Sequence, residues 1–405
     1  MKKLTLDLIF RVVGILAKLG IVVLLERSLS ADEFAQYAIF LALIALGSNI
    51  FRFGSDNLLF RISTSGSLLD LSQGLSRVVD LYKHSLLLKV TIAFFASYFL
   101  SVIEVCILIV GIESLSLLHY YCLVIRARGQ ISTSIFISEV APNVLLIFSI
   151  LLASPVAGQE AILMQYMIIL LISSVCFIKE RKLISYFLRR RQGVTKKPFK
   201  PYLKEISFFG FANFSNSFTS WGDVLLIGLL FDPVLTTAYF LLTRVFSGCE
   251  RIAIIPLYPV YNFLGREFQR DGYILRSKIL KIVPAFMGYS VILLFGSIGL
   301  VAVLSVSSFD IFEGLGVISL SAQVALLLSL FIVSTGTVIE HMSFIIGFQK
   351  LALVNSLRII VIRLCVILAM LLVLEVNFML YIFVAALIVL LARLSLLRKM
   401  LRRSK

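Results

Sequence analysis

The chain has 405 residues, of which 60% are hydrophobic and 15% charged, and its 38 Lys and Arg against 22 Asp and Glu give a net charge of +16. Soluble globular domains carry about 25% charged and 45 to 50% apolar residues, so this composition excludes a water-soluble protein. The charge-free tracts 282–309 and 314–339 exceed the roughly 20 residues that a helix needs to cross a bilayer, which predicts an all-α integral membrane protein.

Hydropathy predicts twelve transmembrane helices, and they use so much of the chain that little remains for a domain outside the membrane. The turn between the third and fourth helices is marked only by Glu104. In chain order the helices are predicted at 8–26, 34–53, 85–103, 105–125, 131–153, 161–178, 206–230, 237–262, 282–304, 322–346, 352–373 and 378–396.

The distribution of basic residues predicts the orientation of these helices. Lys and Arg outside the spans concentrate in the two termini and in the connections that follow even-numbered helices, whereas the odd-numbered connections hold Arg27 alone. Because cytoplasmic loops carry the excess of Lys and Arg, both termini are predicted to be cytoplasmic.

The chain is predicted to consist of two six-helix halves, 1–178 and 206–405, joined by a basic cytoplasmic linker at 179–205. The linker is expected to lie against anionic lipid, with a regulatory or partner-docking role as the alternative. The halves repeat weakly, since LSADEFAQYAIF after the first helix corresponds to LFDPVLTTAYFL after the seventh. Halves of six helices each start on the same side, which predicts a parallel repeat about an axis along the membrane normal, as in transporters.

Two structural ion pairs are predicted inside the membrane, where an ionisable side chain is costly and needs a partner or a cavity. Asp223 and Arg244 flank one turn at equal distances and are expected at one depth on neighbouring helices. Glu340 and Arg358 flank a later turn in the same way.

The remaining basic residues at membrane depth form a candidate anion site. Arg11 and Lys18 are seven residues apart, which is two helical turns, and Arg244 and Arg251 have the same spacing. Arg363 lies at the midplane without an evident acidic partner. Snorkelling to lipid head groups is the alternative for Arg11 and the expectation for Arg52 and Arg393.

Polar residues at membrane depth add further candidates. Asn213 and Asn216 are candidates for hydrogen bonds to sugar hydroxyls, with interhelical packing as an equal alternative. Glu139, followed by Pro142, is either a proton-coupling carboxylate or the partner of a buried base.

Several functional classes are excluded or disfavoured by the sequence. No GxxxxGK[ST] loop is present, so ATP hydrolysis by this chain is excluded and we predict a transporter, not an enzyme. The five cysteines and three histidines show no ligand spacing, so no metal or other cofactor is expected. The basic residues are interleaved with apolar helices and match no nucleic-acid motif.

The stretch LLERSLSADEFAQYAIFLALIALGSNIFRFG resembles the first and second spans of bacterial polysaccharide flippases. The stretch from ISFFGFANF to IIPLYPV, residues 206–260, is similar to their seventh and eighth spans. That family belongs to the multidrug, oligosaccharidyl-lipid and polysaccharide exporter superfamily. In it the first, second, seventh and eighth spans line the cavity, so the resemblance implies that Lys18 and Arg251 face one another across it.

The resemblance implies a flippase of the bacterial inner membrane for undecaprenyl-pyrophosphate-linked repeat units of O-antigen, capsule or exopolysaccharide. Its partners would be that glycan lipid, anionic lipids and the polymerase and chain-length proteins of the pathway. A cationic site suits a pyrophosphate, because guanidinium groups match its oxygens. The alternatives are a flippase for the lipid-linked peptidoglycan precursor, a multidrug exporter of the same superfamily and a membrane polysaccharide polymerase.

Overall fold

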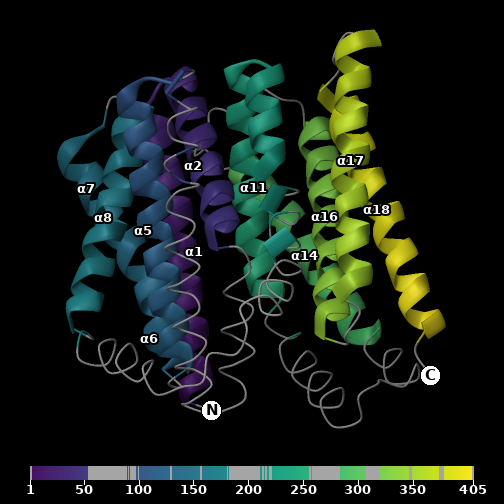
Figure 1. The fold of residues 1–405 in the computed structure, drawn as a ribbon, viewed down its shortest axis with the longest axis horizontal. Coiled ribbons are helices and arrows are strands. Elements are labelled where there is room, and N and C mark those ends of the chain that lie inside the picture. The colour runs from purple at the N-terminus through teal and green to yellow at the C-terminus, as the bar shows by residue number, and fades with distance from the viewer. Residues whose placement is uncertain are drawn as a thin grey trace. The chain divides into compact units, whose positions relative to one another are not determined.

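The structure is a computed structural model, and every element that it describes is helical, which confirms the predicted all-α fold class (Figure 1). The chain divides into two compact units, Met1–Ser217 and Phe218–Lys405. The predicted linker lies almost entirely outside the described residues. These residues are 2–52, 101–127, 130–155, 157–179, 221–254, 283–306, 320–345, 349–373 and 378–403, with isolated positions between them.

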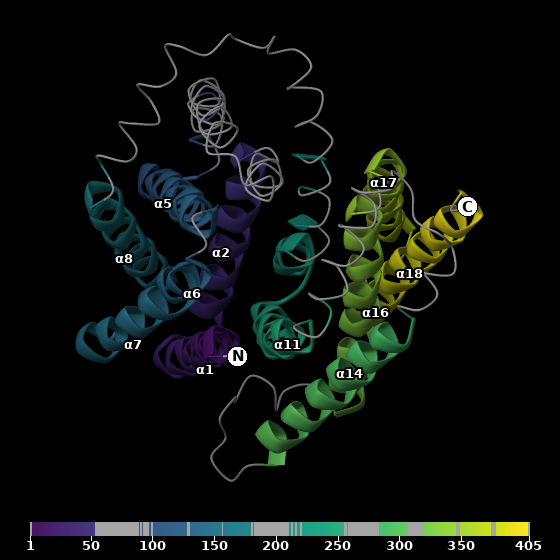
Figure 2. The same cartoon turned by 90° about the horizontal axis from the view of Figure 1, so that it is seen from below.

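The helices of unit 1 form a bundle (Figure 2). In it α5 contacts α8 and α2, while α1 contacts α7 and the π-helical segment η1 that precedes α7. The predicted fifth span is one continuous helical stretch with three parts, because a π-helical segment, η1, separates α6 from α7. The elements are α1 Lys2–Ser28, α2 Ala31–Arg52, α5 Val102–Ala127, α6 Ile131–Ile135, η1 Phe136–Val140, α7 Ala141–Ala153 and α8 Gly158–Lys179.

The helix starts follow from short sequence signals. Ser101 and Glu104 form a capping box, in which the Glu104 carboxylate accepts the Ser101 N–H at 2.8 Å and the Ser101 hydroxyl accepts the Glu104 N–H at 3.3 Å. This box places the start of α5 at Val102, three residues before the predicted start of the fourth span, so Glu104 lies inside the helix and not in the turn before it. In unit 2, the Asp232 carboxylate accepts the Leu235 N–H at 2.7 Å, with Pro233 at the first helical position.

Glycines allow α2 and α5 to approach closely. A Cβ atom built at Gly47 would meet the Ile112 side chain, and one built at Gly111 would collide with the Ile44 side chain. Small residues at such crossings let helix backbones come together in a membrane, where dispersion contacts drive association. The two glycines and two isoleucines therefore form a reciprocal contact that holds the centre of unit 1.

The acidic first turn of α2 attaches this helix to α8. The Glu33 carboxylate accepts the Gly158 N–H at 2.6 Å, at the start of α8, and the Tyr37 hydroxyl donates to Gln165 at 2.7 Å. Tyr37 is buried. The DEFAQY sequence thus has a packing role, because it satisfies one of the unpaired N–H groups at a helix start.

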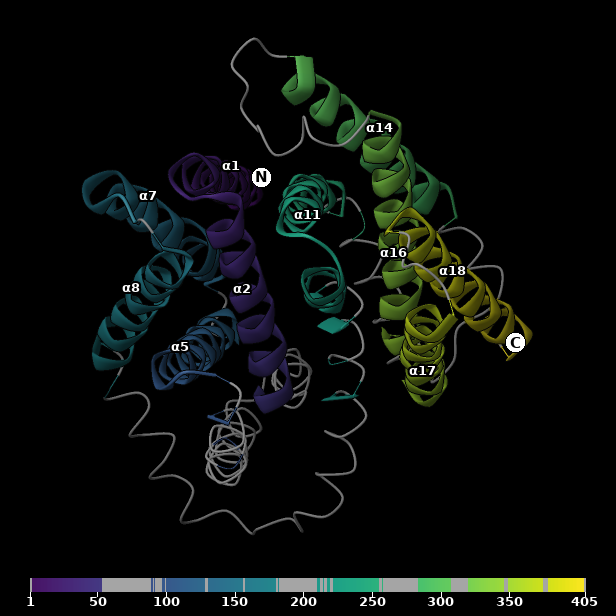
Figure 3. The ribbon, with the colours of Figure 1, turned by 90° about the horizontal axis from the view of Figure 1, so that it is seen from above.

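In unit 2, α11 packs against α14 and α16, and α18 packs along α16 and α17 (Figure 3). A short apolar helix, Trp221–Leu230, precedes α11. The other elements are α11 Pro233–Ala253, α14 Val283–Val306, α16 Leu320–Ile345, α17 Gln349–Val373 and α18 Phe378–Arg403.

Six of the described helical stretches are long and apolar enough to cross a membrane. They coincide with predicted spans, and the total of twelve spans, the boundaries of the two halves and their linker, the parallel repeat and the cytoplasmic termini remain predictions. The six stretches are Leu6–Ser28, Ala31–Arg52, Val102–Arg126, Ile131–Ala153, Gly158–Lys179 and Tyr381–Arg402.

Candidate functional site

A buried ion pair joins two helices of unit 2. Arg363 on α17 donates through Nη2 to both carboxylate oxygens of Asp223, at 2.6 and 2.7 Å. Two hydroxyls also donate to this carboxylate, that of Tyr381 on α18 at 3.0 Å and that of Tyr239 on α11 at 3.4 Å. Arg363 is 2% exposed and Asp223 4%.

This cluster has the composition that a charge needs away from water. An isolated carboxylate in a low-dielectric interior is strongly disfavoured, whereas opposite charge and hydroxyl donors on its remaining lone pairs compensate it. Because Asp223 receives bonds from three different helices, it ties α11, α17 and α18 to the Trp221–Leu230 helix.

The pair predicted for Asp223 with Arg244 is formed with Arg363, and the expectation that Arg363 has no acidic partner is wrong. The prediction compared depth along neighbouring helices and left the helix face out. Tyr239 faces Asp223, and Arg244 follows it by five residues, which turns Arg244 about 140° around α11. The partner of Asp223 is instead Arg363, which lies on α17, far along the chain.

Arg244 lies between two aromatic rings. Its Cζ atom is 4.3 Å from the ring centroid of Trp221 and 4.4 Å from that of Phe240. Stacking on aromatic faces holds a guanidinium in place and keeps its positive charge, with its N–H groups at the edge of the plane. Arg251 is two turns further along α11 and is exposed. The helix therefore carries two cations, one of them oriented by stacking.

In unit 1 the basic residues of α1 share a helix face with a glycine that touches Glu139. A Cβ atom built at Gly14 would lie 3.0 Å from the Glu139 Cβ atom. Arg11 precedes Gly14 by three residues and Lys18 follows it by four, so both neighbour Gly14 on the same face. This contact brings the face of α1 that carries Arg11 and Lys18 to η1, where Glu139 lies; both basic side chains are half-buried.

The π-helical segment that presents Glu139 has a cause in the sequence. Pro142 has no N–H group and cannot make the regular α-helical bond. Immediately before it, the Ala141 N–H donates to Phe136, five residues back, and the Asn143 amide donates to the Glu139 carbonyl. Single π turns inside α-helices occur frequently at functional sites, which agrees with Glu139 as a functional candidate.

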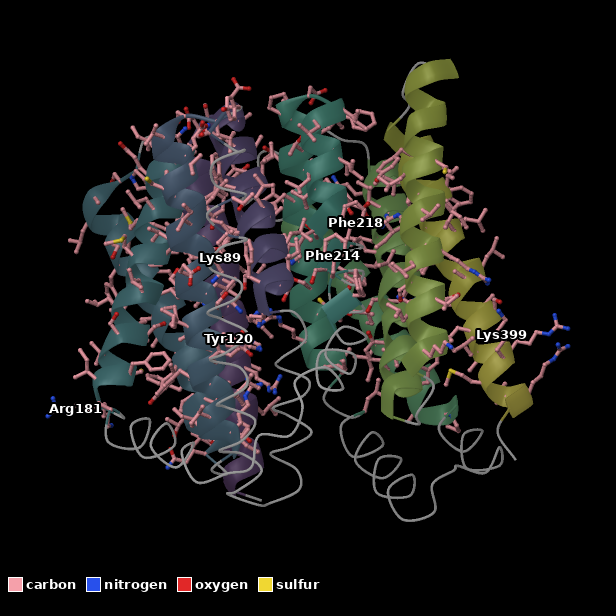
Figure 4. The ribbon with its side chains drawn as sticks, viewed as in Figure 1. Lys89, Tyr120, Arg181, Phe214, Phe218 and Lys399 are labelled. Atoms are coloured by element: carbon pink, nitrogen blue, oxygen red, sulfur yellow. The ribbon has the colours of Figure 1, made fainter. Side chains whose placement is uncertain are left out.

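Unit 1 also contains a buried charge pair that the sequence reasoning missed. Lys89 lies 2.5 Å from the carboxylate of Glu113 on α5, and its ammonium is 5.3 Å from the ring centroid of Phe51. Figure 4 shows Lys89 among the helices of unit 1, whereas Arg181 and Lys399 lie at helix ends. The signal was present, because Lys89 and Glu113 are single charges within apolar stretches.

The expectation that Arg52 and Arg393 snorkel to lipid head groups is wrong, because Arg52 is 7% exposed and Arg393 1%. Arg52 donates to the Ser48 carbonyl at 3.2 Å and to the side chain of Asn49, which in turn donates to Ser217 at 2.5 Å. Both arginines are therefore packed within their units and do not extend to the surface.

The other candidates have different outcomes. Asn213, Asn216 and the side chain of Glu340 lie outside the described residues. Arg358 is exposed on α17. Among the residues that the structure describes, no three His, Cys, Asp or Glu side chains lie together in a way that could hold a metal ion.

Comparison with known proteins gives matches among solved structures, although no protein-family model and no curated protein matches. An inward-facing multidrug resistance MATE family transporter of the MOP superfamily is 15% identical, over 97% of this chain and 96% of that chain, with a TM-score of 0.55. The outward-facing conformation of such a transporter is 15% identical over 99% and 96%, with a TM-score of 0.58. The MATE multidrug transporter DinF-BH, in complex with a bound compound, is 14% identical over 98% and 94%, with a TM-score of 0.54.

The chain has the MATE transporter fold. At this level of identity the likeness concerns the fold alone, which is that of a multi-pass membrane transporter. The neighbour with the TM-score of 0.55 is itself described as a member of the MOP superfamily.

Proposed function

We propose that the protein is a membrane transporter that exposes an anionic, lipid-linked cargo alternately to the two sides of the bacterial inner membrane. The cargo is an undecaprenyl-pyrophosphate-linked glycan repeat unit for surface polysaccharide synthesis. The lipid tail stays in the bilayer, and the pyrophosphate and sugars cross along cationic helix faces.

The observation that carries this proposal is the charge balance of the helices. Two carboxylates inside the units, Asp223 and Glu113, are each bound by a basic side chain. Along α1 and α11, seven basic residues, Arg11, Lys18, Arg244 and Arg251 among them, stand against three acidic ones, Asp7, Glu26 and Glu250. Positive charge in excess of carboxylate suits a pyrophosphate, because each charge-assisted hydrogen bond is stronger in a low dielectric. Arg363 is committed to Asp223, so we assign it a structural role.

A second candidate function is multidrug export, and the comparisons favour it over the glycan lipid. The structural neighbours are described as multidrug transporters, and one of them is in complex with a bound compound. The excess of basic residues is less suited to a cationic compound, since like charges repel at short range. The fold is compatible with either cargo, and a transport assay distinguishes the two.

Transport by the purified protein in proteoliposomes tests the two candidates directly. One arm follows movement of a fluorescent pyrophosphate-linked glycan lipid between leaflets, and the other follows uptake of the cationic dye ethidium. Glycan-lipid movement without dye uptake is the expected result. Dye uptake without glycan-lipid movement would establish the second candidate.

Substitutions then test the cationic residues. Losing one charge-assisted contact costs about 1.5 to 3 kcal/mol, or roughly ten- to a hundredfold in affinity, so Lys18→Ala and Arg251→Ala should weaken glycan-lipid binding by that factor. Arg251→Lys should restore part of it, because an ammonium replaces a guanidinium. Arg402→Ala, at an exposed position near the end of α18, is the matched control. Parental activity in both alanine variants would contradict the proposed role of these two residues.

A further inference from the structure

The last helix of unit 2, α18, has one face packed inside the unit and another that is exposed and basic. Leu396 is 1% exposed and Met400 0%, and α18 packs along α16 and α17. On the other face Arg398, Lys399 and Arg402 are exposed, and Figure 4 shows Lys399 on the outer side of α18. Because the helix is packed as far as Met400, in its last turn, the basic face is held away from the interior of the unit.

A fourth exposed cation, Lys350, lies at the same end of unit 2. It is in the first turn of α17, and residues 374–377 alone connect the end of α17 to the start of α18. The two helices pack against each other, have 25 and 26 residues and run in opposite directions, so the start of α17 is level with the end of α18. Lys350, Arg398, Lys399 and Arg402 together are named the terminal basic surface.

The lengths of these helices place the terminal basic surface at the membrane boundary. A helix rises about 1.5 Å per residue, so roughly 20 residues cross a hydrocarbon layer of about 30 Å. Counted from Phe378, at the start of α18, that length reaches about Arg398, and the basic residues that follow lie at the depth of the lipid phosphates. The same length counted back from Val373 leaves the start of α17 at this depth as well.

The two helices themselves do not explain the charges of the terminal basic surface. Neither α17 nor α18 contains an Asp or Glu residue. A helix dipole stabilises cations in the last turn, which accounts for Arg402 alone, because Arg398 and Lys399 lie before that turn. Lys350 is at a helix start, where the dipole disfavours a positive charge. This arrangement therefore favours an anion that comes from outside the chain.

We propose that the terminal basic surface binds the phosphate groups of anionic phospholipids in the leaflet that it meets. Basic residues next to a membrane helix attract anionic lipid, and each one contributes roughly fivefold to the preference over neutral lipid. Long Lys and Arg side chains reach the head groups from a helix end. The proposal goes beyond the transport function, because it concerns the lipid around unit 2 and holds for either cargo.

Quenching of a local fluorophore measures which lipid lies at this surface. Ser395 is exposed and precedes Arg398 by three residues and Arg402 by seven, so it lies on the same face of α18. In the full-length protein without its native cysteines, Ser395→Cys carries the fluorophore, and the vesicles contain no cargo. Brominated phosphatidylglycerol, which is anionic, should quench roughly fivefold or more better than brominated phosphatidylcholine, which has no net charge. Salt at about 1 M should reduce this preference, because exposed charges are screened.

Variants assign the preference to the terminal basic surface. Replacing all four of its residues by Gln should abolish the preference. Arg398→Lys with Arg402→Lys should retain it, because both variants keep the charge that attracts a head group. The same fluorophore at Phe148→Cys, 60% exposed on α7, is the matched control position, because α7 contains no charged residue. It should be quenched equally by the two lipids.

Three results would overturn the proposal. One is equal quenching by the two lipids at Ser395→Cys in the protein with all four basic residues, in which case the surface fits an acidic protein segment better. Another is a preference that survives replacement of all four residues. The third is an equal preference at Phe148→Cys, because the attraction would then belong to the whole protein. No arm requires transport, so failure of the proposed function would leave these outcomes unchanged.

Discussion

Among the described residues, removing the guanidinium of Arg363 leaves the Asp223 carboxylate, in the interior of unit 2, with the hydroxyls of Tyr239 and Tyr381 as its remaining partners. Breaking a buried pair by deleting one partner costs about 3 to 5 kcal/mol, because the remaining charge is uncompensated. For a unit of this size, 1 kcal/mol corresponds to about 2 to 4 °C in Tm, so Arg363→Met should lower the Tm by roughly 6 to 20 °C.

Thermal unfolding of the purified protein in detergent measures this decrease in Tm. Three further variants test whether the decrease comes from the ion pair. Arg358→Ala removes an exposed arginine from the same helix and should change stability by less than about 0.5 kcal/mol. Asp223→Asn removes the charge that needs a partner, so Arg363→Met should cost less in that background than in the parental protein. Exchange of the two residues, Asp223→Arg with Arg363→Asp, should recover part of the loss.

Two results would refute this reasoning about the ion pair. One is a Tm of Arg363→Met no lower than that of Arg358→Ala. The other is strict additivity of Asp223→Asn and Arg363→Met, because residues in direct contact should show an interaction energy of about 0.5 to 3 kcal/mol.

Two further predictions concern packing and topology. Gly111→Val should destabilise unit 1 by about 1 to 3 kcal/mol through collision with Ile44, whereas Gly288→Ala, with nothing within 4 Å of the added atom, should not; equal Tm values would contradict the close contact of α2 and α5. In a cysteine-free background, single cysteines should react with an impermeant reagent from outside at some turns and only after permeabilisation at others, and outside labelling at Gln192 would contradict the two-half topology. The outside positions are Ser30, Ser154 and Asp232, and the inside positions are Ser72, Gln192 and Gly272.

Features that depend on residues close in sequence were predictable. The helix start at Ser101 and Glu104 follows from a pattern of four residues, and the structure has the turn at that place. Helical spans follow from apolar length, because a bilayer imposes the same requirement on every crossing helix.

The choice of charge partners was not predictable in the same way. Asp223 and Arg363 are 140 residues apart, and their contact depends on which helices are neighbours and on which face each side chain lies. Depth alone left Arg244 and Arg363 equally eligible. The Lys89 pair with Glu113 could have been suspected, since each is a single charge in an apolar stretch, but its geometry again depends on helix packing.

The π-helical segment η1 has a consequence for how this helix tolerates insertions and deletions. A π turn accommodates one residue more than an α-helical turn, and each residue corresponds to about 100° of rotation. Because the π turn takes up its extra residue within one turn, the residues before η1, such as Ser132, which donates to Asp7, and those after it, such as the buried Leu146, keep the faces that a regular helix one residue shorter would give them. Deleting one residue within 136–140 should therefore leave both ends of the helix against their partners, whereas deleting one residue elsewhere in 131–153 would turn one end by about 100°, so a deletion is better tolerated in η1 than in the rest of this helix.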